Sequence, residues 1–175
     1  MTLMNTATIF RSECFEISSY EGYSDLLDLS QEFDAYRDAR HPVGRCEALF
    51  TSPTLHGVTR WTKANMLNLR EKKTAETFAF TVNADTTLVY NLELWEDFCC
   101  GIEGAAEEYW NTAQTLTVWL AEGNLENRGL SHEILFTVEN MLSEPKQVIP
   151  QQLVEAYGDQ AGRTHFVDNV HRLIA

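Results

Sequence analysis

The chain reads RCEALFTSPTLHGVTRW from Arg45 to Trp61, and this stretch decides the fold. A short apolar strand, Ala48–Phe50, leads directly into a helix. Ser52 is the expected N-cap, because its hydroxyl can accept a hydrogen bond from a free amide of the first turn, and Pro53 suits the first helical position. The apolar face of the helix repeats every three residues and comprises Leu55, Val58, Trp61 and Ala64. We therefore expect a strand-to-helix corner packed on a sheet.

Such a corner is suited to an anionic ligand. Free amides and the positive end of the helix dipole lie at the end of a strand, where a phosphate group can bind. Arg45, just before the strand, can add a forked donor at the same place. The alternative is a capped helix without a ligand, which is what most Ser-Pro corners are.

Length and composition indicate one ordinary globular domain that spans residues 1–175. Hydrophobic residues make up 44% of the chain and charged residues 22%, so the acidity does not reflect disorder. The net charge of -13 argues against general binding to nucleic acid or to an anionic membrane, because both require a basic face. It permits a basic protein partner, or imitation of nucleic acid.

The cysteines do not have the spacing of a metal site. Cys14 and Cys46 are isolated, and Cys99 and Cys100 are adjacent, so we expect reduced thiols and no bound metal. The first ten residues lack the charged start and apolar run of a signal peptide, and no segment has the length of a membrane span. We therefore expect a cytoplasmic protein.

The first predicted strand, residues 6–17, carries an arginine among apolar neighbours. Alternation along the strand places Arg11 on the same face as Ile9, and an arginine in such a position usually has an anionic partner. That partner is Glu13, Glu16 or a ligand.

The remaining patterns alternate between helix and strand. Residues 24–36 predict a helix through the spacing of Leu26, Leu29, Phe33 and Tyr36. Residues 77–82 and 86–94 alternate well and predict a hairpin that turns at 83–85. Residues 97–119 predict a helical region, 131–138 a strand, 147–149 a short strand, and Phe166, Val170 and Leu173 a closing helix. Strands with helices grouped between them predict an α+β fold.

Several motifs occur in an order that resembles a known group of proteins. They are IFRS at 9–12, GRCEALFTSP at 44–53, AEEYW at 106–110, HEILF at 132–136 and a final VIP at 148–150. Together they resemble a bacterial uncharacterised family of the ADP-ribosyltransferase-like superfamily. The resemblance implies a split pair of small antiparallel sheets with flanking helices, and NAD bound as a substrate in the cleft between the sheets.

The resemblance also implies roles for individual residues. Arg11 corresponds to the residue that grips a phosphate or ribose of NAD, and Thr51 and Ser52 take the place of the segment that shapes the nicotinamide pocket. Glu133 takes the place of the catalytic glutamate. Arg45 joins this set as the forked donor near the corner.

These residue types suit the chemistry. Cleavage of the bond between nicotinamide and ribose passes through an oxocarbenium-like state, which a nearby carboxylate stabilises. The pattern departs from side-chain-modifying transferases, because Ser131 stands where they often carry an acidic residue or glutamine, and a His-Gly-Thr motif is missing. Without the resemblance, Glu133 is an exposed strand residue, Arg11 forms a structural salt bridge, and Tyr109 packs in the core.

Two functions are therefore expected. The first is an NAD-dependent ADP-ribosyltransferase that modifies a host or partner macromolecule, as a toxin, an effector or a phage-encoded modifier does. The alternative is a non-enzymatic acidic inhibitor, such as an immunity protein or nucleic-acid mimic, that binds a basic partner through the stretch Glu93–Glu108. A ligand-binding or dimerisation module on the same fold is a third possibility.

Overall fold

The computed structural model describes residues 5–15, 23–60 and 74–148. The elements in chain order are β1 (Thr6–Phe15), α1 (Tyr23–Asp34), β2 (Leu49–Thr51), β3 (Thr74–Asn83), β4 (Leu88–Asn91), α3 (Leu92–Cys99), α4 (Ala105–Asn111), β5 (Gln114–Thr115), α5 (Leu116–Ala121), α6 (Leu125–Arg128), β6 (His132–Phe136), η1 (Val138–Asn140) and β7 (Lys146–Gln147). A helical turn also occupies residues 55–60. The predicted closing helix, and the end of the helix that follows the corner, lie outside the described residues.

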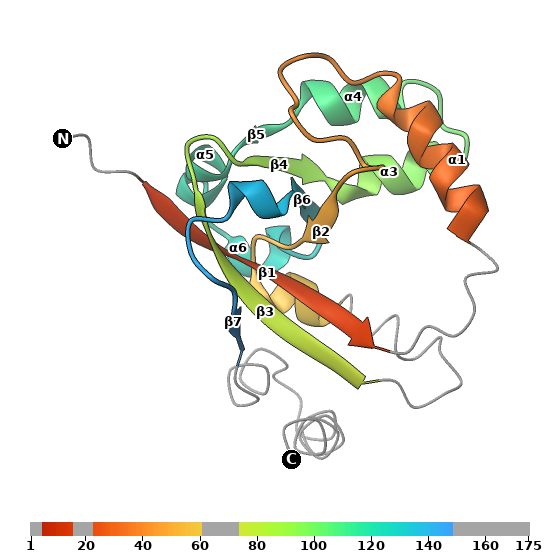
Figure 1. The fold of residues 1–175 in the computed structure, drawn as a ribbon. Helices are drawn as coiled ribbons and strands as arrows, with labels where there is room; N and C mark the ends of the chain where they lie inside the picture. The colour runs from red at the N-terminus through yellow and green to blue at the C-terminus, as the bar shows by residue number, and fades with distance from the viewer. Residues whose placement is uncertain (1–4, 16–22, 61–73, 149–175) are drawn as a thin grey trace.

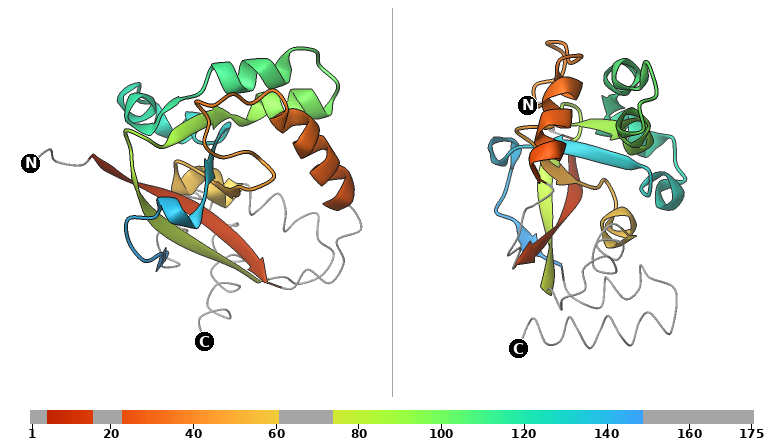
Figure 2. Two further views of the ribbon diagram at one scale, coloured as in Figure 1. Left: turned by 45° about the horizontal axis from the view of Figure 1, so that its top comes forward. Right: turned by 90° about the vertical axis from the view of Figure 1, so that its right-hand side faces the viewer.

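The predicted α+β class is confirmed. Two small antiparallel sheets carry the described strands, in the orders β1-β3-β7 and β2-β6-β4-β5. The sheets are joined by one bridge, in which Phe10 N donates to Ser52 O at 2.9 Å and Ser52 N donates to Phe10 O at 2.7 Å. Helices α3 and α4 lie side by side on the far side of the second sheet from the long strands β1 and β3 (Figure 1; Figure 2), whereas α5 lies near the start of β1.

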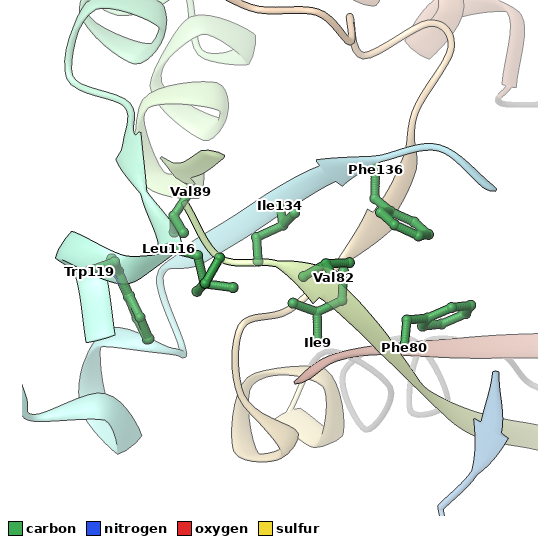
Figure 3. Packing of buried hydrophobic residues seen from close by; sticks show 9 residues of the cluster. Ile9, Phe80, Val82, Val89, Leu116, Trp119, Ile134 and Phe136 are labelled. Carbon is green, nitrogen blue, oxygen red and sulfur yellow. The ribbon is translucent and has the colours of Figure 1, made fainter. Parts of the chain in front are cut away.

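Strand β6 separates two hydrophobic cores, because its alternate side chains point to opposite faces. Ile134 and Phe136 join the first core, between the sheets, whereas Leu135 joins the second. The other buried members of the first core are Ile9, Phe80, Val82, Ala84, Val89, Leu116 and Trp119 (Figure 3). The other buried members of the second are Phe33, Val43, Tyr90, Ala106, Tyr109 and Trp110. The predicted strand at 131–138 is thus confirmed together with its two faces.

The predicted hairpin is wrong in its pairing. Both strands form, but β3 pairs with β1 and β7, whereas β4 pairs with β5 and β6. A turn closed by Thr87 N donating to Asn83 O at 3.0 Å carries the chain from one sheet to the other. The amide of Ala84 donates to Asn5 O at 2.9 Å, which ties this turn to the start of β1. Alternation along a strand reports its buried face and carries no information about its partner.

The predicted helical region at 97–119 is divided. Helix α3 already begins at Leu92, because the side chain of Asn91 accepts a hydrogen bond from Glu93 N at 3.0 Å and caps it. The strand predicted to run to residue 94 therefore ends at Asn91. Gly101 and Gly104 adopt φ values of +80° and +83° and separate α3 from α4. Strand β5 then separates α4 from α5.

The helix after the corner begins later than predicted. It starts at residue 55 and its cap is Thr54, whose hydroxyl accepts from Gly57 N at 3.0 Å. Ser52 still accepts a hydrogen bond, from Thr54 N at 3.3 Å, but it does so as a member of the bridge between the sheets. Pro53 consequently lies before the helix. The bridge fixes Ser52 in an extended conformation, which delays the first helical turn.

Phe33 on α1 is central to the second core and provides a test of it. It is fully buried and meets the rings of Trp95, Phe98 and Tyr109 edge-on, at centroid distances of 5.0, 4.9 and 4.9 Å. Replacing Phe33 with alanine should lower the free energy of unfolding by about 3–5 kcal/mol, through lost burial and a residual cavity. Urea unfolding followed by circular dichroism measures the change.

Tyr36 supplies the matched control. The sequence places it on the same apolar face as Phe33, but α1 ends at Asp34 and Tyr36 is 49% exposed. Its replacement by alanine should change the stability by less than about 0.5 kcal/mol. Equal losses from the two variants would show that α1 does not pack as described.

Candidate functional site

A charged cluster is buried in the second core, where strand β6 faces helix α4. Arg45 Nη1 donates to Glu133 Oε1 in a buried ion pair and to Tyr109 OH at 3.1 Å. The hydroxyl of Tyr109 donates to the same carboxylate oxygen at 2.7 Å. The three residues are 7%, 6% and 0% exposed, so water reaches little of the cluster.

Asp34 at the end of α1 brings Arg45 into this position. Its two carboxylate oxygens accept hydrogen bonds from Arg45 N at 2.8 Å and from Cys46 N at 3.0 Å. The preceding Gly44 allows the close approach, because a Cβ atom there would lie 2.5 Å from Asp34 Oδ2. The pinned backbone directs the arginine side chain inward, although its neighbours Cys46 and Glu47 are exposed.

Aromatic rings enclose the guanidinium group. Its central carbon lies 4.0 Å from the ring centroid of Trp95 and 4.7 Å from that of Phe50. Cation–π contacts of this kind stabilise an arginine that has lost its water. The Nε atom of Arg45 is buried and has no hydrogen-bond partner among the described residues. Both hydrogen bonds of the guanidinium therefore come from Nη1, and the buried Nε donor is unmatched within the described residues.

The surroundings favour the charged form of Arg45 and the protonated form of Tyr109. Burial works to lower the pKa of Arg45, but the charges of Glu133 and Tyr109 and their hydrogen bonds outweigh it, so this pKa is raised. Burial, followed by the negative charge of Glu133, raises the pKa of Tyr109 well above its usual value. The raised pKa favours the protonated phenol, which donates its hydrogen bond to the carboxylate.

A second polar pair packs against the cluster. Tyr90 stacks on Tyr109 with a centroid distance of 4.8 Å and an interplanar angle of 11°, and its hydroxyl lies 3.2 Å from His41 Nδ1. His41 is only 5% exposed, and burial lowers its pKa. Ring stacking thus places a second hydrogen-bonded pair beside the cluster, with no hydrogen bond between the two among the described residues.

The other predicted site residues lie at the junction of the sheets. Arg11 Nη1 donates to Phe50 O at 2.9 Å, and Thr51 Oγ1 donates to Ile134 O at 3.2 Å. Ser52 Oγ lies 3.5 Å from the carbonyl oxygen of Gly129, to which it donates. These described contacts go to backbone groups that hold β1, β2 and β6 together. The structure thus unites the side chains of Arg45 and Glu133, while those of Thr51 and Ser52 serve the neighbouring junction.

Sequence reasoning missed Trp95 and misjudged the burial or the contacts of Tyr109, Glu133 and His41. Tyr109 does pack in the core as predicted, but it also donates to Glu133. Glu133 is not the exposed strand residue of the alternative interpretation. Trp95 was not singled out, because the predicted strand ran through residue 94 and concealed the start of α3. His41 lies in a loop, where a single histidine is usually solvated, but it is buried, and a loop has no periodicity to reveal this.

The described residues and the comparisons with known proteins assign no further role to the chain. Within the described ranges, no group of three or more His, Cys, Asp or Glu side chains is arranged to hold a metal ion, and no helix there is long and apolar enough to cross a membrane. No family model, curated protein or solved structure matches the chain.

The energetic coupling between Arg45 and Glu133 can be measured. Arg45→Met leaves a buried carboxylate without its cation and should lower the free energy of unfolding by about 3–5 kcal/mol, as should Glu133→Gln to a smaller extent. The double variant should lose less than the sum, with a coupling of about 1–3 kcal/mol by urea unfolding. Additive losses would contradict the pairing.

An exposed ion pair serves as the control. Arg40 pairs with Asp38, and their side chains are 66% and 47% exposed. Because water screens such a pair, Arg40→Met should cost less than about 1 kcal/mol.

Proposed function

We propose that this chain is an ADP-ribosyltransferase-like protein that cleaves NAD and transfers ADP-ribose to a host or partner macromolecule. The observation that carries the proposal is the burial of Arg45 and Glu133 together. A buried ion pair is weak evidence for stability, because an apolar replacement is often at least as stable. Ionisable groups held in such a setting are instead enriched at functional sites.

The residues around Glu133 suit the chemistry of NAD cleavage. A carboxylate in a site that excludes water stabilises the positive charge that develops on the ribose as nicotinamide leaves. The hydroxyl of Tyr109 holds that carboxylate in one orientation at 2.7 Å. Arg45 supplies a fork of donors for a phosphate group, and its Nε atom already lacks a partner among the described residues.

The arrangement of the strands supports a split-sheet fold of this superfamily. The sheets meet at the bridge between Phe10 and Ser52, next to Arg11 on β1. Thr51 on β2 pairs with Ile134, the neighbour of Glu133 on β6. Arg11, Thr51 and Glu133 thus lie on three neighbouring strands, while Arg45 precedes β2 and Ser52 directly follows it. An NAD molecule bound in a cleft between the sheets would lie along this junction.

Access to Glu133 requires a movement of helix α3, whose side chains cover Arg45. This helix contributes no fully buried residue, and Trp95 and Phe98 are only partly buried. Gly101 at its end has a positive φ and lies in an exposed turn. We propose that α3 moves away from β6 when NAD binds, and that Arg45 then exchanges the carboxylate for a phosphate.

Release of nicotinamide from NAD tests the proposal. The purified chain, with and without a host lysate as acceptor, should release nicotinamide, and labelled NAD should mark an acceptor. Glu133→Gln keeps the shape of the side chain and should lower the rate by about 10²–10³, which is typical for the loss of one electrostatic stabiliser. Circular dichroism establishes that the variant is folded.

Glu139→Gln is the control for charge. Glu139 is exposed on η1 and carries the same functional group outside the cluster. It should leave the rate unchanged. No release of nicotinamide under any condition, or equal rates for the Glu133 and Glu139 variants, would overturn the proposal.

A second candidate function rests on the charge of the helical end of the molecule. Residues 74–127 contain no lysine, arginine or histidine. The exposed acidic residues of this end are Glu93, Glu96, Asp97, Glu103, Glu107, Glu108 and Glu122. All but Glu122 lie on or between helices α3 and α4, which lie side by side (Figure 1), and Glu122 directly follows α5. An acidic surface without interspersed cations favours a basic protein partner and speeds association with it.

A charge-placement experiment tests this second function. A deca-arginine peptide should bind the chain, and binding should weaken steeply between low and high salt. Neutralising Glu96, Asp97 and Glu103 as their amides should weaken binding at least tenfold at low salt, measured by fluorescence anisotropy. Neutralising Asp28, Glu47 and Glu144 removes the same net charge elsewhere and should have a smaller effect. Equal effects would show that only net charge matters.

A further inference from the structure

A polar hollow lies close to the buried cluster, between strands β4, β5 and β6 and helix α4. Its volume is about 190 Å³. Val89 and Leu94 form apolar parts of its wall, and its polar lining includes Asn91, Glu108, Gln114 and His132. Pockets for whole cofactors measure roughly 300–1,000 Å³, so this hollow is too small for a dinucleotide. Since a water molecule occupies roughly 30 Å³ in the liquid, it has room for the head of one side chain.

His132 presents a hydrogen-bond acceptor at this hollow. Its Nδ1 atom lies 2.7 Å from the carbonyl oxygen of Arg128 and must carry the hydrogen, because a carbonyl only accepts. In the neutral ring the Nε2 atom then has a free lone pair, and it hydrogen-bonds to none of the described residues. The ring is fixed by an edge-to-face contact with Trp119 at 5.7 Å. Burial lowers the pKa of His132, which favours the neutral ring at pH 7.

The charge at the hollow is negative. Glu108 supplies a carboxylate from α4, and no lysine or arginine lines the hollow. The nearest described cation, Arg128, is already paired with Glu122, and its guanidinium also lies over the ring of Trp119. Glu108 and His132 therefore supply hydrogen-bond acceptors to the lining, and the carboxylate of Glu108 attracts positive charge.

We propose that this hollow binds the guanidinium group of an arginine side chain presented by a protein partner. A guanidinium carries five donors in a planar fork, so it can reach a carboxylate and an imidazole nitrogen at the same time. Val89 and Leu94 accommodate the apolar stem of the arginine side chain. The inference goes beyond the transferase proposal and holds whether or not the chain uses NAD.

The NMR signals of the histidine rings provide a site-specific test in solution. The chain has five histidines, so labelling histidine with ¹³C gives few ring signals in the NMR spectrum. The signal that is missing from the spectrum of the His132→Gln variant belongs to His132. The full chain is titrated with N-acetyl-arginine amide, N-acetyl-lysine amide and N-acetyl-citrulline amide. Citrulline has the shape of arginine without its charge. We expect a saturable shift of the His132 signal with arginine, and binding at least tenfold weaker with lysine and with citrulline, a difference of about 1.4 kcal/mol.

Two neighbouring variants make the test decisive. Glu108→Gln removes the carboxylate that lines the hollow and should weaken arginine binding at least tenfold. Glu107→Gln removes the same charge from the adjacent exposed position of α4, which does not line the hollow, and should leave binding within twofold. Failure of the His132 signal to saturate with arginine, equal binding of citrulline or lysine, or equal losses from the two variants would overturn the proposal.

Discussion

The ion pair between Arg45 and Glu133 is the constraint on which the second half of the fold depends. Moving two charges into a core costs several kcal/mol per ion, so the surroundings must supply hydrogen bonds and attraction in return. Tyr109 donates to the carboxylate, and Trp95 and Phe50 lie against the guanidinium. Each of these contacts comes from a different element. The pair consequently fixes the positions of α3, α4, β2 and β6 relative to one another.

The pair also explains why strand β6 has two different faces. On its first-core face, Ile134 and Phe136 pack against apolar side chains, and such packing tolerates apolar replacements of similar shape. Its other face carries Glu133 beside Leu135, and a carboxylate accepts only one arrangement of donors. The proposed chemistry and the strict geometry therefore lie on the same side of the strand. His132, at the start of β6, alternates with Glu133 and lies on the face of Ile134, where its ring contacts Trp119 of the first core.

Much of the local structure, but little of the pairing, could be predicted from the sequence. Strands β1, β2 and β6 were predicted because β-branched and aromatic residues alternate in them. Glu133 and Arg45 could be singled out by their chemical type in a resembling motif. Their direct contact could not, because it depends on Asp34 capturing two amides across a loop. The false hairpin and the late helix start have a similar origin, since a distant strand determined the conformation in each case.

Among the described residues, the bridge between Phe10 and Ser52 is the one place where the backbones of the two sheets pair. The ladder of β1 and β3 runs in register over ten residue pairs, whereas the two sheets share only this one pair. Pro53 follows directly and has no amide to extend the ladder. Arg11 Nη1 adds one side-chain hydrogen bond across the same junction, to Phe50 O. The two sheets are therefore held together mainly by the apolar side chains of the first core that lie between them, so loss of that packing should separate the sheets before it disrupts either one.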